Sequence, residues 1–201
     1  MPTKSAVLRN GLVAVLISVP TLALAHTSAV GASGVIYGLA HPIGGIDHVL
    51  GMIAVGVFAA NLGGRAFWAV PLAFMTLMAA GSAAGILGMH MPYAEVGIAL
   101  SIVVLGVVIT VRFEWPVATA MTLVGLFAVF HGHAHGTEMP VDASGAAYAL
   151  GLVTATGLLH LSGVAIGIGI TTAGLRHSPR IMQSGGAAFA VAGLLVLSRA
   201  I

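Results

Sequence analysis

Residues 93–111 read YAEVGIALSIVVLGVVITV and contain a single acidic or basic side chain, Glu95. A helix of about 20 apolar residues spans the ~30 Å hydrocarbon core of a bilayer. Lipid offers no hydrogen-bond partner to the backbone, so a spanning segment must satisfy its own N–H and C=O groups, as a helix does. We therefore expect this stretch to be a transmembrane helix.

Five other stretches share this apolar character. Their expected limits are 43–62, 66–88, 115–132, 144–171 and 183–201. At ~1.5 Å of rise per residue, each is long enough to cross the hydrocarbon core as a helix. The sequence between them leaves room only for short loops. The predicted fold is an all-α membrane protein, a six-helix transmembrane bundle that occupies residues 26–201 as one domain in contact with the lipid bilayer.

The composition agrees with a membrane protein. Hydrophobic residues make up 59% of the chain and charged residues 6%, whereas a soluble domain is about 25% charged. The net charge of +2 is not gathered into a basic patch, so no nucleic-acid partner is expected. Cysteine is absent, which excludes disulfides and thiolate metal ligands. The 28 glycines favour close helix packing in lipid, and the Gly81–Gly85 and Gly163–Gly167 spacings fit that use.

The N-terminal segment has the features of a secretory signal. Lys4 and Arg9 precede an apolar run over 11–22, and Ala23-Leu24-Ala25 matches a small-x-small cleavage site. We expect residues 1–25 to be a signal peptide, which makes His26 the mature N-terminus on the periplasmic side. An uncleaved first helix is the alternative. A terminal amine beside an imidazole can chelate a metal, so His26 is a secondary ligand candidate.

The arginines predict the orientation. Four of them fall in loops on one side of the six-helix arrangement: Arg65, Arg112, Arg176 and Arg180. The opposite loops, around 89–92 and 133–143, contain no Lys or Arg, and Arg199 is the exception on that side. Cytoplasmic loops are enriched in Lys and Arg. We therefore expect a multi-pass protein of the bacterial cytoplasmic (inner) membrane with its mature N-terminus in the periplasm.

The first histidine cluster is His41-Pro42-Ile43-Gly44-Gly45-Ile46-Asp47-His48, at the outer end of the 43–62 helix. Its proline and glycines disfavour a regular helix there. A carboxylate at this depth costs roughly 2.5–3.5 kcal/mol on insertion scales and therefore needs a partner. Two imidazoles and one carboxylate suit a divalent transition metal. The alternative is a helix cap in which Asp47 is hydrogen-bonded to a histidine.

The second cluster lies at the outer end of the fourth helix, where residues 130–138 read FHGHAHGTE. If this segment is helical, His131, His135 and Glu138 share one face at i, i+4 and i+7, and His133 points away. The alternative is a solvated His-rich loop. Both clusters are on the same side of the membrane, which favours a shared metal site.

Two isolated residues complete the set. Glu95, near the outer end of its helix, is either a ligand or an interfacial anchor. His160 lies deep in the 144–171 helix, where a polar side chain is a functional candidate; a neutral histidine bonded to a backbone carbonyl is the alternative. The predicted metal ligands are His41, Asp47, His48, Glu95, His131, His135 and Glu138, with His26, His133 and His160 as secondary candidates.

At these residues the sequence resembles the HupE/UreJ family, the hydrogenase and urease accessory nickel permeases. The matching motifs are His41-Pro42 through Asp47-His48 with Met52 and Val55-Gly56, the run from Phe130 to Glu138, and Ala155 to His160. The similarity covers nearly the whole chain. It implies a secondary transporter that imports nickel or cobalt for metalloenzyme or cofactor assembly, with the metal ion as cargo and no resident cofactor.

Other functions remain to be compared with this one. The sequence contains no G-x-x-x-x-G-K-[ST] loop, so ATP need not drive transport. An intramembrane zinc hydrolase could use Ser82, Ser101 or Ser162 beside the histidines, but neither cluster contains a serine. A metal sensor or storage protein is a third interpretation, although no soluble domain is expected. The sequence leaves nickel against cobalt, proton coupling and oligomeric state open.

Overall fold

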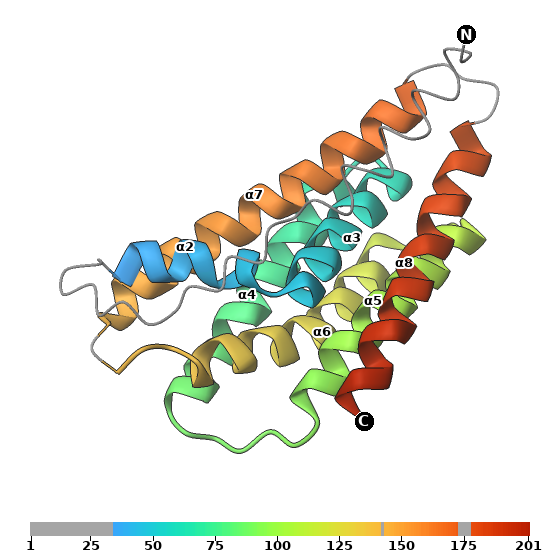
Figure 1. The fold of residues 1–201 in the computed structure, drawn as a ribbon. Coiled ribbons are helices and arrows are strands. Elements are labelled where there is room, and N and C mark those ends of the chain that lie inside the picture. The colour runs from blue at the N-terminus through green and yellow to red at the C-terminus, as the bar shows by residue number, and fades with distance from the viewer. Residues whose placement is uncertain (1–33, 142, 173–177) are drawn as a thin grey trace, which may run out of the picture. The chain divides into compact units, whose positions relative to one another are not determined.

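The computed structural model describes residues 34–141, 143–172 and 178–201, all of which belong to one compact unit, Ala32–Ile201. The predicted signal peptide, His26 and Arg176 lie outside the described residues. Figure 1 shows the described part as a set of helices joined by short connections. The helices are α2 (Gly34–Gly44), α3 (Ile46–Leu62), α4 (Ala66–Ile86), α5 (Ala94–Val111), α6 (Val117–Thr137), α7 (Gly145–Thr172) and α8 (Ser178–Ala200).

Length and apolar character qualify the helices α4 to α8 as membrane spans, five in all within the described residues. A sixth span is counted if α2 and α3 together form one broken span. The prediction of a helical membrane bundle is confirmed in this coarser form. The expected end of the fourth span at 132 was too early, because α6 continues through the His-rich segment to Thr137 and is capped where the Glu138 N–H bonds to the Ala134 carbonyl.

The first span differs from the expectation of an irregular backbone at 41–45. Helix α2 continues through His41 and Pro42 to Gly44, and the break is confined to Gly45, whose φ of −102° and ψ of 117° are extended. The axes of α2 and α3 are bent by 84° there. Pro42 removes one hydrogen bond from α2, the one that its own nitrogen would donate four residues back, and the helix ends two residues later. As a result, His41 comes from α2 and not from the outer end of α3.

Glycines allow the helices to pack at very short range. On α6, a Cβ added to Gly132 or Gly136 would overlap the carbonyl oxygen of Met78 or Ser82 on α4. The contact is reciprocal, because Gly81 and Gly85 of α4 face carbonyls of α6 in the same way. The predicted use of the Gly81–Gly85 spacing is therefore confirmed. Similar glycine contacts join α3 to α7, α2 to α7 and α5 to α8.

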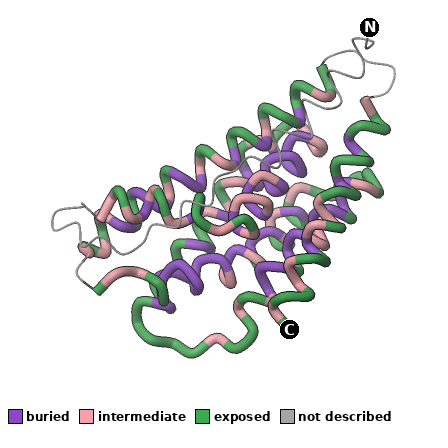
Figure 2. The backbone as a smooth tube through the Cα atoms, viewed as in Figure 1, coloured by how far each residue is buried: buried purple, intermediate pink, exposed green. Residues whose placement is uncertain are grey.

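The buried residues lie on the faces that the helices turn toward one another, as Figure 2 shows for the purple segments of α3, α5 and α6. Large apolar side chains such as Trp68, Leu72 and Leu161 are exposed on the outer faces. An exposed apolar exterior is what lipid as solvent requires. The buried polar side chains are few, and most of them are histidines.

Candidate metal-binding site

Three helices bring four histidines together. The rings of His41 (α2) and His48 (α3) both lie against His135 (α6), with centroid separations of 4.9 Å and 4.5 Å. The ring of His131, one turn earlier on α6, lies 5.2 Å from that of His48. We call His41, His48, His131 and His135 the outer histidine cluster. The two motifs that sequence analysis identified separately thus form one site.

The helical course of α6 explains why two of its histidines enter the cluster. Side chains four residues apart lie on the same face of a helix, and His131 and His135 are both fully buried. The α3 residue opposite them is a glycine: a Cβ at Gly51 would lie 2.9 Å from Cε1 of His131. The absence of a side chain at this position leaves room for the imidazole, so the alternative of a solvated loop does not describe this segment.

One ring nitrogen of His48 is held by a carboxylate. Its Nδ1–H donates to Oδ1 of Asp47 over 3.0 Å, and its backbone N–H donates to the same oxygen over 2.9 Å. The other ring nitrogen, Nε2, is buried and has no hydrogen-bond partner. With the proton on Nδ1, Nε2 presents a lone pair. Asp47 therefore does bond a histidine, as the alternative interpretation supposed, and that bond also leaves a free ligand nitrogen.

His131 is held in an equivalent way by a serine. Ser101 donates its proton to the Ile98 carbonyl over 2.6 Å, so its Oγ accepts from Nε2–H of His131 over 3.0 Å. Nδ1 of His131 then carries the lone pair, and it is buried without a partner. Metal-ligating histidines commonly donate their other ring N–H to an oxygen, which fixes the tautomer and the ring orientation. Both His48 and His131 fit that pattern.

His135 lies at the centre of the cluster. Both of its ring nitrogens are buried and lack a hydrogen-bond partner, while its backbone carbonyl accepts a bond of 2.9 Å from the Tyr148 hydroxyl. An unpaired buried polar group costs about 1–3 kcal/mol. A ligand that uses one of these nitrogens would remove part of that cost.

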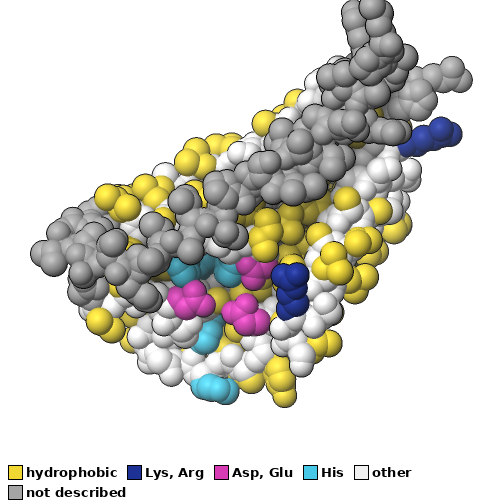
Figure 3. All heavy atoms as spheres, in the orientation of Figure 1, with side chains coloured by type: hydrophobic (Ala, Val, Ile, Leu, Met, Phe, Trp, Pro, Cys, Tyr) yellow, Lys and Arg dark blue, Asp and Glu magenta, His cyan; other side chains and the backbone are white. Residues whose placement is uncertain are grey.

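Carboxylates surround the exposed side of the cluster. Oε2 of Glu138 lies 3.2 Å from Nε2 of His41, and this hydrogen bond holds the pKa of Glu138 below its usual range. Glu95, exposed in the first turn of α5, is close enough to Asp47 and Glu138 for their charges to act on it. Figure 3 shows acidic and histidine side chains side by side on one face of the molecule, with a basic side chain next to them. The carboxylates would attract a cation toward the imidazoles.

The remaining histidine candidates lie apart from the cluster. His133 faces the loop between α4 and α5, where its Nε2–H donates to the Met89 carbonyl over 2.6 Å. This agrees with the expectation that it points away from His131 and His135. His160 is buried in the middle of α7, and neither of its ring nitrogens has a partner. The carbonyl bond offered as its alternative role is therefore not formed.

The side chains are close together but do not yet enclose an ion. Among the described residues, no three histidine, aspartate or glutamate side chains stand in an arrangement that would hold a metal as they are placed. The rings meet in T-shaped and tilted contacts. To bring several lone pairs onto one point, the His135 ring, whose nitrogens have no hydrogen-bond partner, would have to turn while His48 and His131 keep their hydrogen bonds.

Sequence reasoning missed two residues beside the cluster, Phe74 and Tyr148, and it considered Ser101 only as a possible hydrolase serine. Ser101 supports His131, the Phe74 ring lies 5.4 Å from the His131 ring, and Tyr148 bonds the His135 carbonyl. Ser101 is the one serine within the apolar 93–111 run, a signal that could have suggested its role as a support for His131. Phe74 and Tyr148 had no such signal, because an aromatic residue in a membrane helix is most often part of the packing.

Comparison with known proteins identifies a family. The family model described as HupE / UreJ protein matches residues 13–196. Protein HupE of Rhizobium leguminosarum bv. viciae is 38% identical over 182 residues, which cover 90% of this chain and 93% of that protein. No solved structure shows a significant match.

Proposed function

On the premise that this chain belongs to the HupE/UreJ family, whose members are accessory transporters and not enzymes, we propose that it imports Ni²⁺ or Co²⁺ from the periplasm into the cytoplasm. The observation that carries the proposal is the convergence of four imidazoles from α2, α3 and α6, with buried ring nitrogens that have no partner. The metal ion is the cargo of this site. Hydrogenase, urease or cofactor assembly would consume it.

The donor set supports a borderline divalent cation. Imidazole nitrogens suit nickel, copper and zinc, whereas hard ions such as Mg²⁺ and Ca²⁺ prefer sites built from oxygen. Asp47, Glu95 and Glu138 would draw the hydrated ion in from the periplasm, and the neutral imidazoles would replace part of its water shell. The ligands do not enclose an ion as they stand, so part of the binding energy is spent on turning the side chains toward it. The weaker binding that results suits a transporter, because conduction requires that the ion can be released.

The membrane potential can drive import without ATP. It contributes about 2.3 kcal/mol per charge per 100 mV. At 100 mV, negative inside, entry of a divalent ion is therefore favoured by roughly 4.6 kcal/mol. That corresponds to a concentration gradient on the order of 2,000-fold. The arginine bias that predicts the orientation puts the outer histidine cluster on the periplasmic side, where capture must occur.

The hydrolase alternative is weakened by the hydrogen bonds of Ser101. A serine nucleophile must give its proton to the base beside it. Ser101 directs its proton to the Ile98 carbonyl over 2.6 Å, and it accepts from His131. Ser101 thus accepts a hydrogen bond from His131, as a residue that supports a metal ligand does. A nucleophilic serine would instead donate its proton to the histidine.

Radiolabelled metal uptake tests the proposed function. Cells that lack their own nickel and cobalt importers should accumulate Ni²⁺ or Co²⁺ when they express this chain, in proportion to the amount of inserted protein. Matched cells that carry the empty vector provide the background. Accumulation at background level for both metals, or a faster loss of preloaded metal, would refute import by this protein.

A further inference from the structure

One further buried histidine lies deeper in the bundle than the outer histidine cluster. His160 is near the middle of α7 and 1% exposed, and both of its ring nitrogens lack a hydrogen-bond partner. Among the described residues it is the only histidine, acidic or basic side chain between the outer cluster and the arginines at the opposite end of the bundle. A polar side chain at such a depth is a functional candidate by default.

The ring of Phe74 on α4 connects the two levels. Its centroid lies 5.4 Å from that of the His131 ring and 5.0 Å from that of the His160 ring. Both imidazoles approach it in T-shaped geometry, with interplanar angles of 62° and 87°. The His131 and His160 rings therefore contact the same buried aromatic side chain, and their centroids are at most about 10 Å apart.

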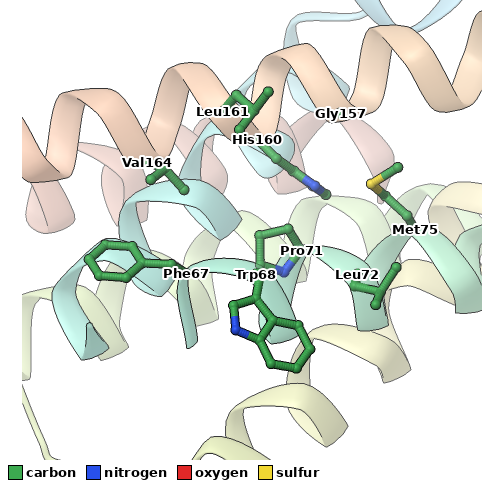
Figure 4. A pocket seen from close by; sticks show the side chains of 9 residues that line it. All are labelled: Phe67, Trp68, Pro71, Leu72, Met75, Gly157, His160, Leu161 and Val164. Carbon is green, nitrogen blue, oxygen red and sulfur yellow. The ribbon is translucent and has the colours of Figure 1, made fainter. Parts of the chain in front are cut away.

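His160 also borders a surface groove. This groove of about 390 Å³ lies between α4 and α7 and opens on the outer, apolar face of the bundle, and Figure 4 shows the His160 ring and the Met75 side chain among its lining. The rest of the lining is apolar and includes Phe67, Trp68 and Leu161. An apolar side chain would fill this position without leaving unpaired nitrogens, so packing alone does not explain a histidine here.

We propose that His160 is a second, inner binding station for the transported divalent transition metal, which the ion reaches from the outer histidine cluster by passing the Phe74 ring. This step rests on the proposed transport function. One neutral imidazole with a few retained waters binds an ion less tightly than several imidazoles and carboxylates do. The ion would therefore be captured at the outer cluster, held briefly at His160 and released inward.

Two substitutions separate a ligand role from a structural role. His160→Leu fills similar space and removes the unpaired nitrogens, so the folded protein should unfold at no lower temperature than the wild type. His160→Gln keeps a polar side chain but removes the imidazole. His90→Leu makes the same change at an exposed loop histidine and is the matched control.

The test is potential-driven Ni²⁺ uptake by purified protein in proteoliposomes, combined with Ni²⁺ titration of the protein in detergent. Both His160 variants should lower the maximal uptake rate on the order of 10-fold, with the outer binding constant and the half-saturating concentration unchanged. His90→Leu should behave as wild type. If either His160 variant transports at the wild-type rate, or if uptake is lost only in proportion to a loss of folded protein, the inner station is refuted.

The same assay distinguishes this failure from failure of the proposed function. If the wild-type protein transports Ni²⁺ and the Asp47→Asn variant does not, the proposed outer site is supported. The His160 variants then test the inner station separately. Wild-type protein that neither binds nor transports Ni²⁺ would overturn both proposals.

Discussion

The imidazoles of His48 and His135 lie 4.5 Å apart, centroid to centroid, although they come from helices α3 and α6, which pack mainly against other helices. The contact depends on α7, because it packs against both α2 and α3 and its Tyr148 hydroxyl bonds the His135 carbonyl. The two histidine motifs of the sequence are thus joined by a helix that contains neither of them.

His133 and His135, two of the three buried histidines near the end of α6, should have unequal effects on transport. His135 contacts His41 and His48, whereas His133 bonds the Met89 carbonyl outside the cluster. We expect His135→Ala to lower Ni²⁺ uptake per inserted protein by at least about 10-fold, and His133→Ala to have a milder effect. Uptake in cells, normalised to the protein in the membrane, measures both. A His133 defect larger than that of His135 would mean that the outer cluster is assigned to the wrong face of α6.

The packing of α4 against α6 should tolerate no side chain at Gly132. A Cβ there would overlap the Met78 carbonyl oxygen, and overpacking of this kind typically costs about 1–3 kcal/mol. Gly132→Ala should therefore lower the thermal unfolding midpoint of the protein in detergent. Gly185→Ala on α8 is the matched control, because nothing lies within 4 Å of its added Cβ. Equal midpoints for Gly132→Ala and the wild type would contradict the close approach of these helices.

The membrane orientation can be tested with single cysteines, because the chain has none of its own. Thr137 and Glu114 are both exposed and flank opposite ends of α6. In intact cells an impermeant thiol reagent should label Thr137→Cys from the periplasm, and it should reach Glu114→Cys only after the membrane is opened. Labelling of both positions from one side would exclude α6 as a membrane span and would remove the basis for periplasmic capture.

Capture should weaken in acid because of the histidines. A free imidazole has a pKa of about 6.5, and its protonated form has no lone pair to give a metal. The hydrogen bond from His41 lowers the pKa of Glu138. A lowered carboxyl pKa means that the charge persists above it and is lost only when the pH falls through it, so Glu138 stays charged in mild acid. The half-saturating Ni²⁺ concentration should therefore rise as the pH, kept equal on both sides, falls from roughly 7.5 to 5.5. A constant value over this range would argue against neutral imidazoles as the capturing groups.

The fold was largely predictable, since lipid imposes long apolar helices that are read directly from runs such as 93–111. The bend at Gly45 was not, because Pro42 and Gly44 suggested a longer irregular segment than the single extended residue that forms. At the site, the helical spacing of His131 and His135 predicted a shared face. The bond between Asp47 and the neighbouring His48 was also within reach of the sequence, because the two residues are adjacent. That His41 approaches His135, and that Ser101 holds one ring nitrogen of His131, depends on packing between helices, which no local pattern encodes.

The most direct test of the account is Ni²⁺ uptake by the Asp47→Asn variant. Asparagine keeps the size of the side chain and an oxygen that can accept from His48, but it removes the negative charge beside the outer histidine cluster. In proteoliposomes with a negative interior, wild-type protein should accumulate Ni²⁺, and equal amounts of inserted Asp47→Asn protein should show uptake close to the background of empty vesicles. Uptake by Asp47→Asn at the wild-type rate would contradict capture of the metal at this site.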